Sequence, residues 1–108
     1  MIRQGFVASM MVALGLGLGV TGTAMAGDAS RGERISTTCV ACHGPGGVSQ
    51  IPSMYPSLAG RDAEELARLL TEFREGERQE PQMSPQAQGL SDQDIEDLAA
   101  YFAAQEPE

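Results

Sequence analysis

The chain has 108 residues, a length that suits a single domain. Its fifteen acidic residues outnumber its seven arginines, lysine is absent, and the formal net charge of −8 argues against nucleic acid as a partner. The two cysteines are too few for a scaffold held together by several disulfides.

The N-terminal segment has the three parts of a secretory signal peptide. Arg3 gives a positive start, residues 6–20 form an uncharged apolar run, and Ala24-Met25-Ala26 forms a cleavage site with small residues at its first and last positions. The alternative is an uncleaved membrane anchor, but the apolar run is shorter than the roughly 20 residues that span a bilayer. We therefore predict that residues 1–26 are removed on export to the periplasm. The mature domain, residues 27–108, is predicted to have no membrane span.

The mature domain of 82 residues is small for a hydrophobic core to stabilise alone, and it has no tryptophan. A large apolar cofactor would supplement such a core. Six arginines and fifteen acidic residues give the mature domain a net charge of −9. That charge keeps a small protein dissolved and attracts basic surfaces on partner proteins, an attraction that weakens as salt rises.

The first element of the mature domain is predicted to be a short helix over residues 28–39, with Asp28 as its N-cap. This helix delivers the first cysteine at its end. The segment 43–60 is rich in glycine and proline, and it is predicted to be loop and turn without a strand.

A one-faced amphipathic helix is predicted over residues 62–75. Its apolar residues are spaced at i, i+3, i+4 and i+7, acidic residues lie near its start, and Gly76 marks its end. These apolar residues are Leu66, Leu69, Leu70 and Phe73. Residues 77–89 are predicted to form a polar loop.

The last element is predicted to be a helix from Ser91 to about Gln105. The sequence Ser91-Asp92-Gln93-Asp94 resembles a capping box, and an apolar stripe follows it. The stripe consists of Ile95, Leu98, Tyr101 and Phe102. Since helices and loops account for the whole mature domain, the predicted fold class is all-α.

The sequence Cys39-Val40-Ala41-Cys42-His43 has the C-x-x-C-H pattern of covalent haem attachment. On one helical turn the two thiols lie on the same side, spaced to add to the two vinyl groups of a single haem. The imidazole of the next residue is then held beneath the ring. We therefore predict one covalent haem c, attached through Cys39 and Cys42, with His43 as an axial ligand of the iron.

Three other kinds of site use similar residues. A thioredoxin-like dithiol requires a C-x-x-C beside a β-α-β pattern, and no strands are predicted here. A structural zinc site needs four Cys or His ligands, whereas the chain has only Cys39, Cys42 and His43. A disulfide between the two cysteines is possible in an oxidising compartment, but it gives the histidine no role. The redox dithiol is the main alternative to haem attachment.

An electron-transfer haem needs a second axial ligand, and a methionine thioether raises the reduction potential by favouring iron(II). Met83 lies forty residues after His43 and beyond a helix, so it can reach the opposite face of the haem. Pro81 and Pro85 flank it and stiffen its loop. We predict that Met83 is the second ligand, the alternative being an exposed loop methionine. Met54 is expected to pack against the haem or to lie exposed.

The second nitrogen of the His43 imidazole needs a hydrogen-bond partner that fixes the orientation of the ring. Pro56 is the candidate, because its ring stiffens the loop at a plausible distance from the histidine. Leu58 is expected to pack on the haem face. Pro52 is the alternative partner, and both prolines could instead simply shape the loop.

Several stretches together resemble the small bacterial class I c-type cytochromes over nearly all of the mature domain. They are Gly32, Cys39 to His43, Pro56 to Gly60, Phe73 to Arg78, Met83, and Leu90 to Phe102. The resemblance implies a class I cytochrome c-like helical bundle around one covalently attached haem. In that bundle the first and last helices cross at a small residue beside an aromatic residue, and Gly32 and Tyr101 or Phe102 match those positions.

The pattern is most similar to one domain of the periplasmic two-haem cytochromes and to the haem subunit of flavocytochrome sulfide dehydrogenases. The chain departs from the first group because it has a single C-x-x-C-H, so it cannot pass electrons between two internal centres. It also has Arg61 where the family usually has Gln. This arginine could pair with a haem propionate or lie exposed at a helix start.

These features predict a periplasmic electron carrier rather than an enzyme, in which a His/Met-ligated haem c shuttles single electrons between redox partners with basic docking surfaces. The first alternative is the haem-bearing electron-transfer subunit of a periplasmic oxidoreductase, such as a flavocytochrome sulfide dehydrogenase. Such a subunit would dock permanently through an apolar face that includes Ile51, Met54 and Tyr55. The second alternative is a gas-binding or peroxidatic haem with an open sixth position.

Overall fold

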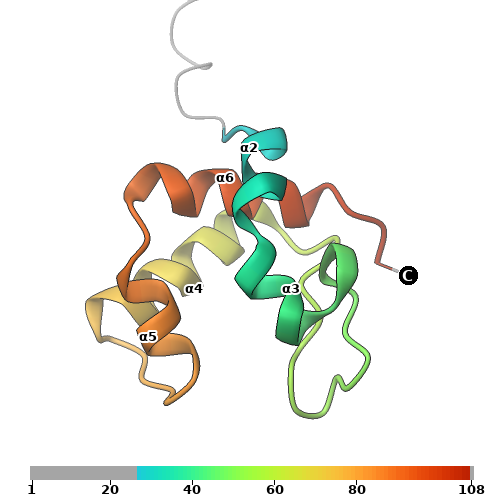
Figure 1. Cartoon of the computed structure of the whole chain (residues 1–108). Helices are drawn as coiled ribbons and strands as arrows, with labels where there is room; N and C mark the ends of the chain where they lie inside the picture. The colour runs from blue at the N-terminus through green and yellow to red at the C-terminus, as the bar shows by residue number, and fades with distance from the viewer. Residues whose placement is uncertain (1–26, 108) are drawn as a thin grey trace, which may run out of the picture.

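A computed structural model describes residues 27–107 of the chain. The signal peptide predicted for residues 1–26 lies outside the described residues. Figure 1 shows that the described part is built from helices and loops, which confirms the predicted all-α fold class. Within residues 27–107, no helix combines the length and the apolar character needed to cross a bilayer.

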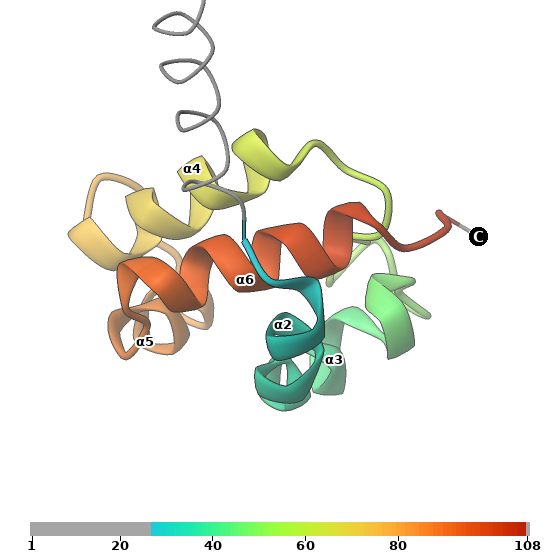
Figure 2. The same cartoon turned by 90° about the horizontal axis from the view of Figure 1, so that it is seen from above.

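The helices pack around α6, the last of them in the chain. In chain order the elements are α2 (Ala29–Ile35), α3 (Thr37–His43), the 3-10 helix η2 (Pro45–Gly47), α4 (Ala63–Glu75), α5 (Met83–Gln88) and α6 (Asp92–Ala103). In Figure 2, α6 runs through the middle of the domain, with α4 along one side and α2 on the other. Helix α6 contacts both of them, and α5 packs on α4.

The N-terminal segment differs from the prediction of one helix over residues 28–39. The chain forms two helices, α2 and α3, which meet at Ser36. This residue is buried, and its hydroxyl donates to the carbonyl oxygen of Glu33 at 2.9 Å. No glycine or proline lies within three residues of the break, although serine is a residue that favours helix ends. Both cysteines therefore lie within a second helix.

The end of α4 at Gly76 and the capping box of α6 form as predicted, and Asp62 adds a cap at the start of α4. The side chain of Asp62 accepts a hydrogen bond from the amide of Glu65 at the start of α4, and Gly76 ends that helix in the left-handed conformation with a φ of 87°. The capping box of α6 is reciprocal, with the side chains of Ser91 and Asp94 each accepting from the backbone amide of the other.

The segment 77–89, predicted to be a loop, contains the short helix α5. Met83 is the first residue of this helix, and Pro85 is the third. A proline in the first turn breaks no helical hydrogen bond, because the amides there have no partner within the helix. The carboxylate of Glu80 accepts hydrogen bonds from the amides of Gln82 and Met83 and thereby caps this turn. Pro85 therefore marks the start of a helix rather than a loop.

A small hydrophobic core lies between α4 and α6. Its buried residues are Leu66, Leu98, Ala99 and Phe102. Partly buried residues pack against it, and they include Ile35, Cys39, Val40, Leu58, Leu70 and Leu90. The apolar stripes predicted for the two long helices thus meet in one core.

Helix α2 crosses α6 closely at Gly32, which is buried. A Cβ atom at this position would overlap the backbone carbonyl oxygen of Asp97 and would lie 2.8 Å from the Cβ atom of Tyr101. Only glycine therefore permits this contact between the backbones. It is the crossing of a small residue beside an aromatic residue that the family resemblance implies.

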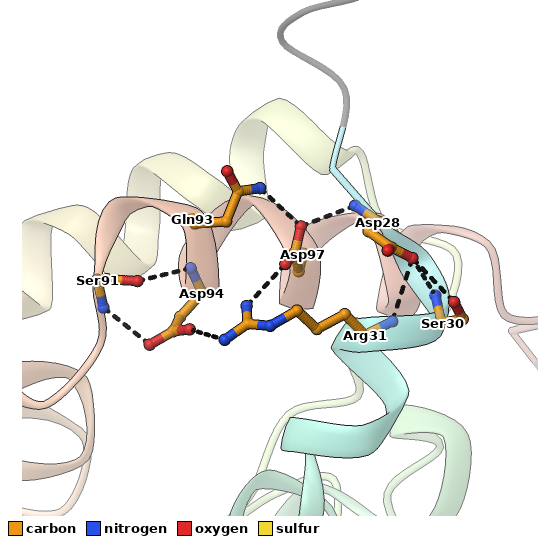
Figure 3. A network of polar contacts seen from close by, with 7 residues as sticks. All are labelled: Asp28, Ser30, Arg31, Ser91, Gln93, Asp94 and Asp97. Carbon is orange, nitrogen blue, oxygen red and sulfur yellow. Dashed lines mark hydrogen bonds and ion pairs between the residues drawn. The ribbon is translucent and has the colours of Figure 1, made fainter.

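A buried carboxylate joins the same two helices. Asp97 of α6 is 1% exposed, and Figure 3 shows the donors that surround it. It accepts hydrogen bonds from the amide of Asp28 at 2.7 Å, from Nη1 of Arg31 at 2.7 Å and from Nε2 of Gln93 at 2.9 Å. The Nη2 atom of Arg31 also pairs with Asp94 at 2.8 Å. Because a buried charge is tolerated only when it is paired and hydrogen-bonded, this network fixes the start of α2 on α6.

The donors around Asp97 hold the pKa of its carboxyl group below the usual value of 3.8, first through the amide of Asp28 and then through Arg31. The pKa of Asp94 is lowered as well, first by the backbone amide of Ser91 and then by Arg31. A carboxyl group with a lower pKa in the folded state stabilises the fold above its unfolded pKa. That contribution is lost as the pH falls through the folded pKa. The network therefore stabilises the domain at neutral pH and weakens in acid.

We expect Gly32→Ala to lower the free energy of unfolding by about 1–3 kcal/mol, because the added methyl group must push α2 away from α6. Urea unfolding followed by circular dichroism measures this change. Gly89→Ala is the matched control, since a Cβ atom there meets nothing within 4 Å and its φ of −87° suits alanine. The control should change the free energy by less than about 1 kcal/mol. Equal losses in the two variants would contradict the close crossing.

Asp97→Asn removes the buried charge while keeping the shape of the side chain. We expect it to lower the free energy of unfolding by about 1–3 kcal/mol at neutral pH, because charge-assisted hydrogen bonds are replaced by neutral ones. As the pH falls below about 5 toward the lowered pKa of Asp97, the wild type should lose stability, because the unfolded chain takes up a proton there before the folded chain does, and the variant should lose less. Urea midpoints measured across this range should therefore converge. Midpoints that stay equally far apart would show that Asp97 does not carry the acid sensitivity.

Candidate functional site

A cavity of about 600 Å³ lies between α3, α4, α5 and the loop that follows η2. Its walls are mostly apolar and aromatic. Helix α3 contributes Cys39, Cys42 and His43 to the walls, and α5 contributes Met83. Figure 1 shows these two helices facing each other across the lower part of the domain. The predicted attachment residues and the predicted second ligand therefore border one space.

Helix α3 carries Cys39, Cys42 and His43 at positions i, i+3 and i+4, a spacing that places them on one face. The thiol of Cys42 is exposed, Cys39 is half-buried, and no disulfide joins them. Burial raises the pKa of the Cys39 thiol, which therefore stays protonated at neutral pH. His43 is 8% exposed. The face thus presents two thiols and one nearly buried imidazole.

The loop after η2 fixes the imidazole of His43. Its Nδ1 atom lies 2.6 Å from the carbonyl oxygen of Pro56. Because a carbonyl oxygen can only accept a hydrogen bond, Nδ1 carries the hydrogen, and Nε2 of the neutral ring keeps a free lone pair. The ring of Tyr55 stands edge-on to the imidazole, with 6.5 Å between the two centres. A histidine held in this tautomer can ligate a metal through Nε2.

The loop that carries Pro56 is itself anchored on η2. The carbonyl oxygen of Gly47 accepts hydrogen bonds from the amides of Leu58 at 2.7 Å and Ala59 at 3.1 Å. Gly47 has a φ of +84°, and a Cβ atom there would lie 2.7 Å from the ring of Phe102. Glycine is therefore required both for the backbone conformation and for the contact with α6. The position of the Pro56 carbonyl depends on this anchor.

Three further residues of the sequence analysis lie outside the main walls or at their edge. Leu58, expected to pack on the haem face, packs against the hydrophobic core and is not among the residues that line the cavity. Its amide is bonded to Gly47 beside Phe102, which places Leu58 next to the core. Met54 is 63% exposed and reaches the rim of the cavity. Arg61 pairs with Glu65 at 3.3 Å.

The structure adds residues to the cavity that the sequence did not single out. The apolar ones are Ile35, Leu70, Phe73, Ala87, Leu90 and Leu98. Three of them, Leu70, Phe73 and Leu98, belong to the predicted apolar stripes, which indicate burial but not what the buried face meets. Glu80 also borders the cavity. The N-cap position of α5 is occupied by Gln82, and glutamate is not a typical capping residue, so the sequence carried no clear signal for Glu80.

The residues present fit a covalently attached haem. Two thiols and an imidazole on one helix face, mostly apolar walls and a thioether from another helix are the attachment, ligand and wall chemistry of a c-type haem. Among residues 27–107, no three side chains of His, Cys, Asp or Glu gather in a group that could hold a bare metal ion.

Comparisons with known proteins agree with this chemistry. The family model described as cytochrome c oxidase, cbb3-type, subunit III matches residues 24–102. Cytochrome c-554(548) of Halomonas halodenitrificans is 48% identical over 84 residues, which cover 75% of this chain and all of the relative. The cytochrome subunit of sulfide dehydrogenase of Chlorobaculum tepidum is 34% identical, over 88% of this chain and 89% of the relative.

The cytochromes c4 are similar but longer. Cytochrome c4 of Pseudomonas aeruginosa is 42% identical over 97 residues, which cover 89% of this chain and 48% of the relative. A crystal structure of reduced cytochrome c4 from Pseudomonas stutzeri superimposes with a TM-score of 0.65 and 31% identity, covering 75% of this chain and 52% of that one. The chain thus spans about half the length of the cytochromes c4 that it matches.

Proposed function

The chain belongs to the class I c-type cytochromes and is an electron carrier, and from that premise we propose that it shuttles single electrons in the periplasm through one haem c. In this proposal the haem is attached through Cys39 and Cys42, and its iron is ligated by His43 and Met83. The haem supplies an iron that alternates between the ferrous and ferric states. No side chain needs to act as an acid, a base or a nucleophile.

One observation carries the proposed ligation: His43 of α3 and Met83 of α5 border the same apolar cavity. The hydrogen bond to Pro56 leaves Nε2 of His43 free to ligate a metal. The thioether of Met83 is a soft ligand that favours the ferrous state and raises the potential. Leu70 and Phe73 form part of the apolar wall, which excludes water from the site.

The periplasmic location in this proposal rests on the sequence of residues 1–26. That segment has a positive start, an uncharged apolar run and a cleavage site with small residues. An exported chain also reaches an oxidising compartment, where two free thiols can form a disulfide. Thioether bonds to a haem would occupy both sulfur atoms and prevent this reaction.

Partner proteins are proposed to dock on an uncharged surface next to the attachment site. Residues 35–60 contain no Asp, Glu, Arg or Lys, although the rest of the mature domain has a net charge of −9. Within this segment Ile51 is 50% exposed and Met54 is 63% exposed. A shallow hollow of about 210 Å³ lies beside them, with Cys42 in its lining. The partner that fits is a redox protein with an apolar contact patch and a basic rim.

A permanent subunit of an oxidoreductase is the second candidate function. Two observations favour it: the similarity to the cytochrome subunit of sulfide dehydrogenase, and the exposed apolar side chains of Ile51 and Met54. Contiguous exposed apolar groups are typical of lasting protein contacts. Co-purification of a catalytic subunit at natural expression levels would distinguish this function from that of a free carrier.

The ligand assignment predicts that Met83→Ala abolishes the sulfur-to-iron charge-transfer absorption of the oxidised protein. The reduction potential should fall by more than about 59 mV, which is a tenfold change for one electron, because the ferrous state loses its thioether ligand. Absorption spectra and a potentiometric titration measure both effects. Met54→Ala is the matched control and should change neither. If Met54→Ala abolished the absorption and lowered the reduction potential, while Met83→Ala did neither, Met54 would be the ligand.

The docking surface predicts that electron transfer to a basic c-type cytochrome, used as a probe in stopped-flow experiments, slows as ionic strength rises. Ile51→Ser should lower the second-order rate constant about fivefold at every ionic strength, which corresponds to roughly 1 kcal/mol of apolar contact. Ala104→Ser, an exposed substitution outside the surface, is the control. A rate that does not depend on salt would count against a basic rim. A rate that does not respond to Ile51→Ser would count against the surface.

A further inference from the structure

We propose that Glu80 is a positioning residue whose carboxylate anchors the backbone of Met83 and so holds the thioether in the cavity. The inference rests on the proposed function, in which Met83 ligates the haem iron. Glu80 acts in it through the main chain of Met83 rather than through contact with the iron.

The contacts of Glu80 converge on the first turn of α5. Its Oε1 atom accepts hydrogen bonds from the amide of Met83 at 2.7 Å and from the amide of Gln82 at 2.9 Å. Its carbonyl oxygen accepts from the amide of Ser84 at 2.9 Å. The hydroxyl of Ser84 in turn accepts from the amide of Glu80 at 3.1 Å. The side chain of Ser84 thus binds the backbone of Glu80, whereas the side chain of Glu80 binds the backbone of Gln82 and Met83.

These bonds account for every amide hydrogen between residues 80 and 85. Pro81 and Pro85 have none, and the other four amides donate to Glu80 or to Ser84. The prolines also restrict the backbone on either side of Met83. The turn that presents the thioether is therefore held by local bonds, and the carboxylate of Glu80 accepts two of them.

Helix α5 needs such an anchor because it is short. It has six residues, and a helix of that length is not stable by itself in water. Among the elements of the described chain it packs mainly on α4. Hydrogen bonds to an ionised carboxylate are stronger than neutral ones, so the loss of Glu80 should free the turn more than the loss of a neutral cap. If the turn were less ordered, the Met83 thioether would bind the haem iron less tightly and would be displaced more easily by another ligand.

Competition with imidazole tests this inference on the haem-loaded full chain, because imidazole binds ferric iron only where the methionine has left it. Glu80→Ala should bind imidazole roughly tenfold more tightly than the wild type, which converts to about 1.4 kcal/mol of lost hydrogen bonding. Glu80→Gln keeps an oxygen acceptor and should show a smaller gain. Glu77→Ala removes an exposed carboxylate from the same loop and should show no gain. A purely structural role would change the urea midpoint but not the imidazole affinity.

The outcomes separate the inference from the proposed function. If Met83→Ala loses the charge-transfer absorption while Glu80→Ala binds imidazole as weakly as the wild type, the role of Glu80 is overturned and the ligand assignment stands. If Glu77→Ala gains as much affinity as Glu80→Ala, negative charge alone is the cause and the anchor is also overturned. If Met83→Ala keeps the absorption, the proposed ligation itself is wrong.

Discussion

The close contact between α2 and α6 is the constraint on which the rest of the domain depends. Gly32 allows the two backbones to meet, and Asp97 binds the start of α2 through its amide and through Arg31. Since only Ser36 separates α2 from α3, the same contact fixes where the two cysteines lie. A buried carboxylate that does not line the cavity thus helps to position the attachment helix.

The two walls of the cavity are held by different means. On the side of α3, the carbonyl oxygen of Pro56 orients His43, and that carbonyl is placed by the anchor of its loop on Gly47. This chain of contacts ends on α6 and belongs to the tertiary structure. On the side of α5, the turn around Met83 is held by hydrogen bonds between near neighbours in the sequence. The histidine side is therefore tied to the core, whereas the methionine side is held locally.

The sequence predicts the parts of this domain that follow from local rules. The end of α4 at Gly76 and the capping box at Ser91 are such parts, because each depends on residues within a turn of it. The break at Ser36 was missed because no glycine or proline lies within three residues of it, although serine favours helix ends. The contact of Leu58 with the core depends on the anchor of its loop on Gly47, a tertiary contact that the sequence does not show. Helix α5 was missed because its two flanking prolines are typical of a loop.

The packing of the first described helix on the last has a consequence for the order of assembly. Asp28 and Asp97 are 69 positions apart, so the loop between them must close before their hydrogen bond forms, and long-range closure of this kind is slow. During synthesis from the N-terminus, α3 forms before the core residues of α6 against which Cys39 packs. Cys39, which is half-buried in the folded domain, is thus more accessible while the domain is still open. Chemical modification of the Cys39 thiol is therefore easier before the fold is complete, whereas Cys42 stays exposed throughout.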